Sequence, residues 1–375
     1  MQKLTSTAVA LALSAGAASA GGLDRSYTPI DQIFEQGSFA EVSYGFTMPD
    51  LTGVDFGGNA IGNVGNDFGV LGSAVKIDFG ERLTFAVIAD QPYGADTVYG
   101  GNPGATLLGG TFAKADTASL TAILKYKFTD RFSVYGGPRT VKADGTIRLS
   151  GLAYAGAGLS GYTVRFNSNN GTGYVIGAAY EIPEYALRVS GTYHSAVDLR
   201  MGTVENIPTT AGGTGTPVGT GITNVEIPQS FELAAQSGIN QNTLVFGSIR
   251  WADWEAFTLN PPSPVPNLAQ LDSVTTYEIG VGRRFSERFS GSVSVSYEDG
   301  GSDSLVSPLA PTNGQTAISV GGQYKVTERI DISGGVRYTW LGNALPEVGT
   351  PDTPVGNFQD NNAVSVGLKV RVALN

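Results

Sequence analysis

The chain has 375 residues, of which 52 are glycine, one is histidine and none is cysteine. Only 15% of the residues are charged, and the formal net charge of −10 argues against binding to nucleic acid, which requires a basic surface. The lack of cysteine and the single histidine exclude thiolate zinc sites, cysteine nucleophiles and multi-histidine metal centres. We therefore expect no metal, no cofactor and no enzymatic activity.

Residues 1–20 have the features of a secretory signal peptide. Lys3 supplies a positive charge, residues 8–18 are apolar, and Ala18-Ser19-Ala20 matches the small-residue pattern of a cleavage site. The apolar stretch is too short to span a membrane as a helix. The sequence thus predicts an exported protein whose mature chain begins near Gly21, located in the periplasm, outside the cell or in the outer membrane.

Alternation with a period of two organises the mature chain. In residues 289–297, apolar side chains alternate with serine, and residues 120–128, 330–340 and 364–372 alternate in the same way. Such segments are typical of β-strands with one apolar and one polar face. No long segment shows a helical period. The sequence therefore predicts an all-β protein.

Short turns alternate with long loops along the chain. The short turns lie at residues 79–83, 128–132, 182–186, 238–242, 285–289 and 326–330, and several share the pattern Glu/Asp-Arg. The long loops lie near residues 49–71, 91–111, 152–161, 206–225, 260–271, 300–314 and 343–359. This order is typical of an outer-membrane barrel with short periplasmic turns and long extracellular loops. It predicts about 14 antiparallel strands in residues 38–375, the last pairing with the first.

Three segments carry a family resemblance. Ile249-Arg-Trp-Ala-Asp-Trp254, Ile227-Pro-Gln-Ser-Phe-Glu-Leu233 and Gly191-Thr-Tyr-His-Ser195 resemble strands of the FadL-type transporters, which carry long-chain fatty acids and other hydrophobic compounds across the outer membrane. The resemblance implies a 14-stranded barrel whose lumen holds an N-terminal hatch. The chain departs from the family pattern in its shorter N-terminal segment, which lacks Asn-Pro-Ala, and in its non-aromatic C-terminus.

Residues 21–37, here called the N-terminal segment, stand where the resemblance implies the hatch. The segment is too apolar for a free tail and does not alternate, so we expect it inside the barrel. Its charged residues are expected to pair with lumen charges such as Arg188 or Arg337. The expected hatch side chains are Leu23, Tyr27, Ile30, Ile33 and Phe34.

Candidate ligand-binding residues follow from the transporter interpretation. Arg188 and Arg337 lie mid-strand, and either one beside an apolar pocket could receive a carboxylate head group through charge-assisted hydrogen bonds. Trp251 and Trp254 are expected on opposite strand faces, one toward lipid and one inside, or as an apolar wall of the ligand path. The loop residues expected to capture a ligand, or merely to cap the barrel, are Leu107, Leu108, Leu152, Tyr154, Leu159 and Tyr162.

Other functions stay open at this point. A hydrolase built on His194 and Ser195 is disfavoured because neighbouring strand residues point to opposite faces. A general porin for small polar solutes and a structural or adhesive surface barrel are the alternatives to a transporter of hydrophobic compounds. The expected partners are the lipid bilayer of a Gram-negative outer membrane, lipopolysaccharide, the barrel assembly machinery and a hydrophobic small molecule.

Overall fold

The computed structural model describes residues 23–374 except 27, 209–215, 264, 266, 270, 302, 350 and 351. The predicted signal peptide and Tyr27 therefore lie outside the described residues. The strands are β1 (Phe39–Asp50), β2 (Gly53–Asp55), β3 (Ala60–Ile61), β4 (Phe68–Phe79), β5 (Leu83–Asp90), β6 (Gly94–Val98), β7 (Phe112–Lys127), β8 (Phe132–Leu149), β9 (Tyr162–Ile182), β10 (Leu187–His194), β11 (Val197–Ile207), β12 (Thr216–Ile227), β13 (Ser230–Asn240), β14 (Thr243–Ala252), β15 (Val274–Arg284), β16 (Phe289–Glu298), β17 (Leu305–Val306), β18 (Gln315–Lys325), β19 (Ile330–Leu341), β20 (Leu345–Val348), β21 (Thr353–Pro354), β22 (Gly356–Phe358) and β23 (Asn362–Ala373). The helices are α1 (Leu152–Ala155) and the 3-10 turns η1 (Asp31–Phe34), η2 (Pro183–Tyr185) and η3 (Trp254–Ala256).

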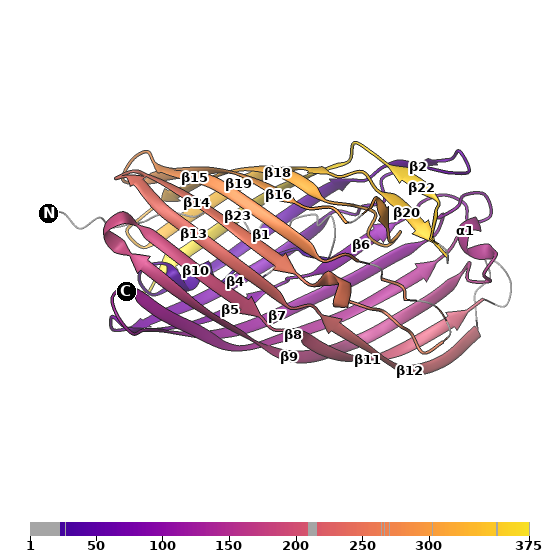
Figure 1. Ribbon diagram of the computed structural model, residues 1–375, viewed down its shortest axis with the longest axis horizontal. Helices are drawn as coiled ribbons and strands as arrows, with labels where there is room; N and C mark the ends of the chain where they lie inside the picture. The colour runs from indigo at the N-terminus through magenta and orange to yellow at the C-terminus, as the bar shows by residue number, and fades with distance from the viewer. Residues whose placement is uncertain are drawn as a thin grey trace.

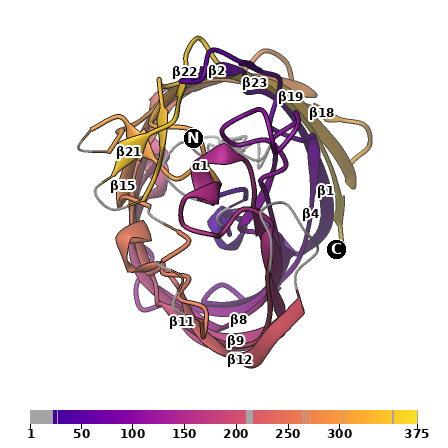
Figure 2. The same ribbon diagram turned by 90° about the vertical axis from the view of Figure 1, so that its right-hand side faces the viewer.

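The wall is a closed antiparallel barrel (Figures 1 and 2). One sheet contains 17 of the described strands, and β1 pairs with β23 from Phe39↔Ala373 to Asp50↔Asn362, which closes the sheet on itself. Three of the crossings are broken into two strands each. These pairs are β5 with β6, β10 with β11, and β12 with β13, and each pair counts as one crossing of the barrel wall. The described residues thus make 14 crossings, as the sequence predicts. Closure leaves no sheet edge in lipid, where unpaired backbone groups are costly.

The two faces of the wall follow the predicted alternation. Val293 and Val295 are exposed on the outer face of β16, whereas Ser294 between them is buried. On β23, Val366 and Leu368 are likewise exposed. Aromatic side chains at the short turns are exposed on the outside, where an interfacial girdle is expected: Tyr126, Phe128, Phe132, Phe285, Phe289 and Tyr324.

All six predicted short turns join consecutive wall strands, at the end of the barrel away from the long loops (Figure 1). The predicted loop at 206–225 is wrong for most of its length, because β11 continues to Ile207 and β12 begins at Thr216. Exposed Asp198 and Arg200 on β11 and exposed Asn224 on β12 interrupt the apolar outer face, which hides the alternation of these strands. None of the described helices is both long and apolar enough to cross a membrane.

The long loops fold into a cap over the opposite end of the barrel, and Figure 2 shows α1 over its opening. Its short strands form two small sheets, β17 with β20 and β21, and β22 with β2 and β3. Buried Asp55 joins two loops, because its carboxylate accepts the backbone N–H groups of Asn59 (2.7 Å) and Leu107 (3.0 Å). Burial works to raise the pKa of Asp55, but these hydrogen bonds outweigh it and the pKa lies below its usual value.

The described part of the N-terminal segment lies inside the barrel. Ile33 on η1 has no exposed surface and packs with Ile30 against a cluster on the inner wall that includes Ala86, Ile123 and Tyr135. The structure thus places Ile30 and Ile33 where the sequence expects hatch residues. Burial of these side chains removes apolar area from the water-filled lumen, which favours the docked position.

Charged contacts also hold the segment. Asp31 lies 3.8 Å from Arg188, and Glu35 lies 3.2 Å from Arg371. Arg188 further stacks over the ring of Phe34 at 4.4 Å from its centroid. The expected pairing with Arg188 is confirmed. Arg337 instead donates to Ser296 (2.8 Å), and no ion pair joins it to the described part of the segment.

Candidate ligand cavity and its floor

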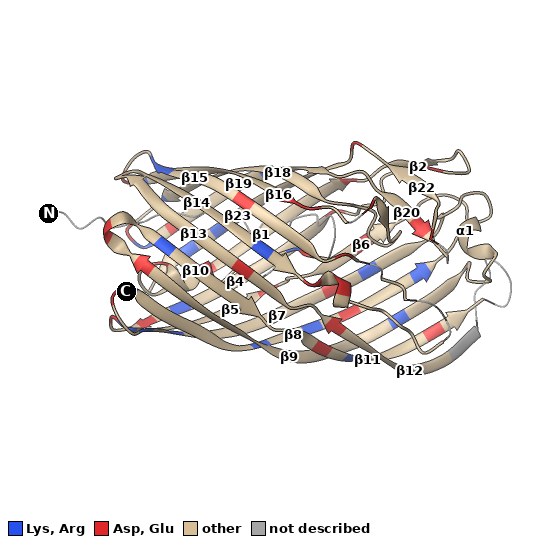
Figure 3. Ribbon diagram, in the orientation of Figure 1, with Lys and Arg blue, Asp and Glu red and all other residues tan. Residues whose placement is uncertain are grey.

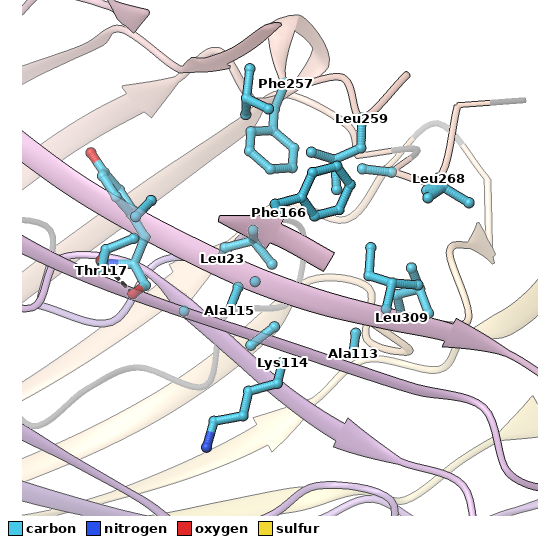
Figure 4. A pocket seen from close by; sticks show the side chains of 18 of the residues that line it. Leu23, Ala113, Lys114, Ala115, Thr117, Phe166, Phe257, Leu259, Leu268 and Leu309 are labelled. Carbon is cyan, nitrogen blue, oxygen red and sulfur yellow. Dashed lines mark hydrogen bonds between the residues drawn. The ribbon is translucent and has the colours of Figure 1, made fainter. Parts of the chain in front are cut away.

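An apolar cavity lies beneath the cap, in the half of the barrel that the long loops cover. It encloses about 810 Å³ of atom-free space, counting the part that is open to solvent. Its lining comes from the inner faces of β7, β8, β9, β11 and β12, from the segment 257–271 and from the loop before β18. Figure 4 shows Phe257, Leu259 and Leu268 on one side of the cavity and Leu23 and Ala115 on the other.

Polar side chains at the cavity wall are engaged elsewhere. Thr117 Oγ1 donates to the carbonyl oxygen of Tyr93 (2.6 Å) and accepts the N–H of the same residue (2.9 Å). Ser307 Oγ accepts the N–H of Leu309. The Lys114 side chain is 59% exposed and points away from the cavity (Figure 4). The wall therefore presents hydrocarbon to a ligand, and a charged group buried against it would be unpaired.

The N-terminal segment forms the floor of the cavity. Leu23 lines the cavity, and the next residue, Asp24, turns its carboxylate toward Arg250 and Trp254. Arg250 donates from Nη1 to Asp24 Oδ2 (2.9 Å) and from Nη2 to Oδ1 (3.1 Å), while Trp254 Nε1 donates to Oδ2 (3.2 Å). We call Arg250 and Trp254 the floor cradle. Its two-pronged contact is the geometry in which guanidinium and carboxylate bind most strongly.

The floor is rigid because its rings pack closely. Trp254 has no exposed surface, and its ring meets those of Tyr93 and Phe257 edge to face, with centroids 5.4 and 5.7 Å apart. The Tyr93 hydroxyl accepts a hydrogen bond from Arg139 Nη2 (3.0 Å). Trp254 thus faces the apolar cavity with its ring and the carboxylate of Asp24 with its N–H.

The same segment continues the wall where β5 gives way to β6. Gly94 N–H donates to the Leu23 carbonyl (2.8 Å), and Arg25 N–H donates to the Pro92 carbonyl (2.7 Å). The Arg25 guanidinium lies 3.6 Å from Asp116, against Gly94, where a Cβ atom would meet it at 2.3 Å. Residues 23–25 therefore behave as a short strand of the wall, which fixes the position of Asp24.

A second, polar cavity lies below the floor, with about 1370 Å³ of atom-free space including its open part. Arg188 and Arg337 both line it, together with acidic residues such as Glu232 and Glu278. Figure 3 shows charges of both signs interspersed along the barrel. Neither arginine lines the apolar cavity, and a role of either one in binding a carboxylate stays a prediction. Arg250 also lines this polar cavity, and it reaches the floor of the apolar one through its contact with Asp24.

The loop residues expected at a capture site pack into the cap instead. Leu108, Tyr154 and Tyr162 are buried in its core, and Leu107 and Leu159 pack against that core. Leu152 is exposed at the surface. Among the described residues that line the apolar cavity, none of these six is found. Long loops with this many apolar residues bury them against each other, which favours the capping role over capture.

The two tryptophans lie on different sides of the wall. Trp251 is exposed on the outer face of β14, whereas Trp254 is fully buried. The sequence predicts this division but places both residues on one strand. In the structure β14 ends at Ala252, and η3 turns Trp254 inward.

The hydroxyl of Ser195 is held by backbone groups and makes no hydrogen bond to His194. Ser195 lies at the break between β10 and β11, where its Oγ accepts the N–H of Tyr174 (2.8 Å) and donates to the carbonyl oxygen of Ala196 (3.0 Å). His194 is buried and lines the polar cavity. No three His, Cys, Asp or Glu side chains of the described residues are arranged to hold a metal ion.

The sequence matches one family along most of its length. Residues 39–371 match the family described as outer membrane protein transport protein (OMPP1/FadL/TodX). The chain belongs to this family. It is accordingly an outer-membrane transport protein for hydrophobic compounds in a Gram-negative bacterium, surrounded by the lipid bilayer. No curated protein matches the sequence.

Solved structures share the fold at low sequence identity. A Pseudomonas aeruginosa FadL homologue superposes with a TM-score of 0.75 at 16% identity, covering 97% of this chain and 98% of that chain. The Pseudomonas putida toluene transporter TodX gives 0.66 at 13% identity, with 91% of each chain covered. The Ralstonia pickettii toluene transporter TbuX gives 0.66 at 14% identity, covering 96% of this chain and 97% of that one. These likenesses establish the family's barrel fold.

Two residues of the floor, Arg250 and Asp24, are not among the candidate site residues that the sequence indicates. Arg250 lies inside the Trp251/Trp254 motif, and strand alternation alone would have placed it on the inner face, opposite to Trp251. Asp24 has no such signal, because its role depends on where residues 23–25 join the wall, 226 positions away from Arg250 along the chain.

Proposed function

We propose that this protein is a passive channel through which hydrophobic compounds, long-chain fatty acids among them, enter the cell, and that the N-terminal segment is its gate. The observation that carries the proposal is the apolar cavity whose floor is made by Leu23 and Asp24. A hydrophobic molecule gains free energy by leaving water for this cavity, at about 25 cal/mol for each Å² of apolar surface buried. It advances when the floor opens, and no chemical step is required.

The contacts of the N-terminal segment suit a gate. They are ion pairs such as Asp31 with Arg188, a small apolar cluster around Ile33, and a few hydrogen bonds between residues 23–26 and the segment 90–94 of the wall. The wall strands are paired independently of them, because the barrel ladders run between neighbouring strands. The segment can therefore leave without unfolding the barrel, and a ligand that binds better to the open form shifts the population toward it.

The decisive experiment compares two solutes and two proteins. Wild-type protein and a variant lacking residues 22–36 are reconstituted in liposomes and tested with a labelled fatty acid and a labelled sugar. We expect the wild type to admit the fatty acid and exclude the sugar. The deletion variant is expected to stay folded, to conduct more in planar bilayers and to lose the preference. Equal uptake of both solutes by the wild type would instead identify a general porin, and uptake of neither would favour a structural barrel.

We further propose the remaining partners. Residues 1–20 direct export, and the barrel assembly machinery inserts the mature chain. Lipopolysaccharide surrounds the extracellular half, where the outer face carries Lys114, Lys142 and Arg165. Cations at this level suit the phosphate groups of that lipid. Photocrosslinking from these positions in intact outer membranes would identify the contact, and labelling of phospholipid alone would contradict it.

A further inference from the structure

The floor of the apolar cavity holds a group that resembles an amphipathic acid. The Leu23 side chain projects into the hydrocarbon lining, and the adjoining Asp24 carboxylate lies in the cradle of Arg250 and Trp254. A bound fatty acid that points its tail into the cavity would place its carboxylate at the same end. We propose that Asp24 occupies the carboxylate site of the substrate, and that the protein selects hydrophobic compounds bearing a carboxylate because only these replace Asp24. This inference rests on the proposed function.

The cradle is built for a carboxylate: its Trp254 ring lines the apolar cavity, and its Arg250 lines the polar cavity below the floor. Arg250 is only 8% exposed and its guanidinium is engaged two-pronged, a geometry that matches two carboxylate oxygens. Trp254 Nε1 supplies a third donor from the ring that also lines the cavity. The cavity wall itself leaves no comparable group, because Thr117 and Ser307 are hydrogen-bonded to backbone groups. A head group therefore finds its partner at the floor.

Exchange of one carboxylate for another explains how a firm contact can still open. Removing Asp24 alone would take from the buried guanidinium the carboxylate that engages both of its Nη atoms, which is unfavourable. A substrate carboxylate that takes its place keeps the cradle satisfied while Leu23 and Asp24 withdraw. A neutral hydrophobic molecule fills the cavity but has nothing to offer Arg250, so it leaves the floor closed. A ligand shifts an equilibrium only through such a difference in affinity for the two states.

The test uses two probes that share one chain length, hexadecanoate and 1-hexadecanol, and measures their binding to the purified full-length protein in nanodiscs by equilibrium dialysis. Asp24→Asn weakens the internal competitor, and Arg250→Met removes the cation. We expect Asp24→Asn to bind hexadecanoate about tenfold more tightly and Arg250→Met about tenfold less tightly, as befits a hydrogen bond to a charged group. Binding of 1-hexadecanol should change little in either variant.

Two control variants separate a binding site from a structural ion pair. Asp31→Asn loosens the same N-terminal segment at Arg188 without touching the cradle, and Arg165→Met removes an exposed cation on the outer face of β9. Both should keep the wild-type ratio of acid to alcohol binding. A purely structural role of the Asp24–Arg250 pair would make its two variants shift hexadecanoate binding in the same direction.

The outcomes distinguish the two proposals. If Asp24→Asn and Arg250→Met shift hexadecanoate binding alike, or if acid and alcohol respond equally, the carboxylate site is refuted while a channel for hydrophobic compounds stands. If Asp31→Asn reproduces the gain of Asp24→Asn, loosening of the segment is the cause and the competition is refuted. If the wild type binds neither probe, the proposed function itself fails. Should Arg250→Met not fold, Asp24→Asn with the two probes decides alone.

Discussion

Replacing Ile33 with alanine should weaken the docking of the N-terminal segment without weakening the barrel. Ile33 has no exposed surface and packs against Ala86, Ile88 and Ile123 on strands whose ladders do not involve it. Truncation of a fully buried isoleucine typically costs about 2–5 kcal/mol when the surroundings cannot collapse into the space. The paired wall strands hold their side chains in place, so the cost falls on the docked segment. The ratio of docked to undocked protein should fall roughly thirtyfold or more.

Single-channel recording in planar bilayers measures this change directly. We expect Ile33→Ala to spend more time in conducting states, with unfolding in urea close to that of the wild type. The matched control is Leu341→Ala, which empties a buried site in the cap cluster at the other end of the barrel and should leave conductance unchanged. Conductance that is identical in Ile33→Ala and wild type, with the segment shown by protease access to be released, would refute the gate.

Three further predictions concern the wall, the cap and the floor. Val320 is 57% exposed on the lipid face of β18, so Val320→Arg should lower the free energy of unfolding in urea by about 2–4 kcal/mol. Ser319→Arg on the lumen side should lower it clearly less. Equal losses would mean that the register of β18 is wrong. Because the pKa of Asp55 is lowered, the stability that its carboxylate gives the cap should be present above about pH 4 and should be lost as the pH falls through the pKa of the folded protein. Limited proteolysis of the cap measures this loss, and in the variant Asp55→Asn the cleavage rate should not depend on pH over that window. Gly94→Ala places a Cβ atom against the Arg25 guanidinium, so we expect the ion pair between Arg25 and Asp116 to break. Channel openings should then become more frequent, and unchanged single-channel recordings would contradict the assigned contact.

The sequence predicts the barrel well because lipid enforces regularity. Every crossing must pair its backbone groups, so alternation and turn spacing survive in segments such as residues 289–297. The prediction fails at β11 and β12, because exposed polar residues such as Asp198, Arg200 and Asn224 interrupt the apolar outer face of these strands. The sequence therefore predicts a loop in this region, although the backbone hydrogen bonds between β11 and β12 continue through it.

The binding site is harder to predict because its contacts are long-range. Arg188 and Arg337 are recognisable as inward-facing cations, but their distance from the apolar cavity depends on their level along the barrel axis, which alternation does not reveal. Arg250 faces inward by the same rule, and it becomes the floor cation only because residues 23–25 pair with the wall beside Pro92. No local pattern connects these positions.

The placement of Trp254 explains how one barrel keeps an apolar and a polar compartment side by side. The polar cavity is lined by the charged side chains of Arg188, Glu232 and Glu278, whereas water in the apolar cavity would remove the advantage that draws in a hydrophobic ligand. The boundary therefore needs a residue that is apolar above and a hydrogen-bond donor below, and a buried indole satisfies both. Its N–H is fixed by the carboxylate of Asp24, which belongs to the segment that we propose as the gate. In that proposal, opening of the floor and wetting of the cavity are one event, and a substrate in the cavity is committed to the lumen when the floor yields.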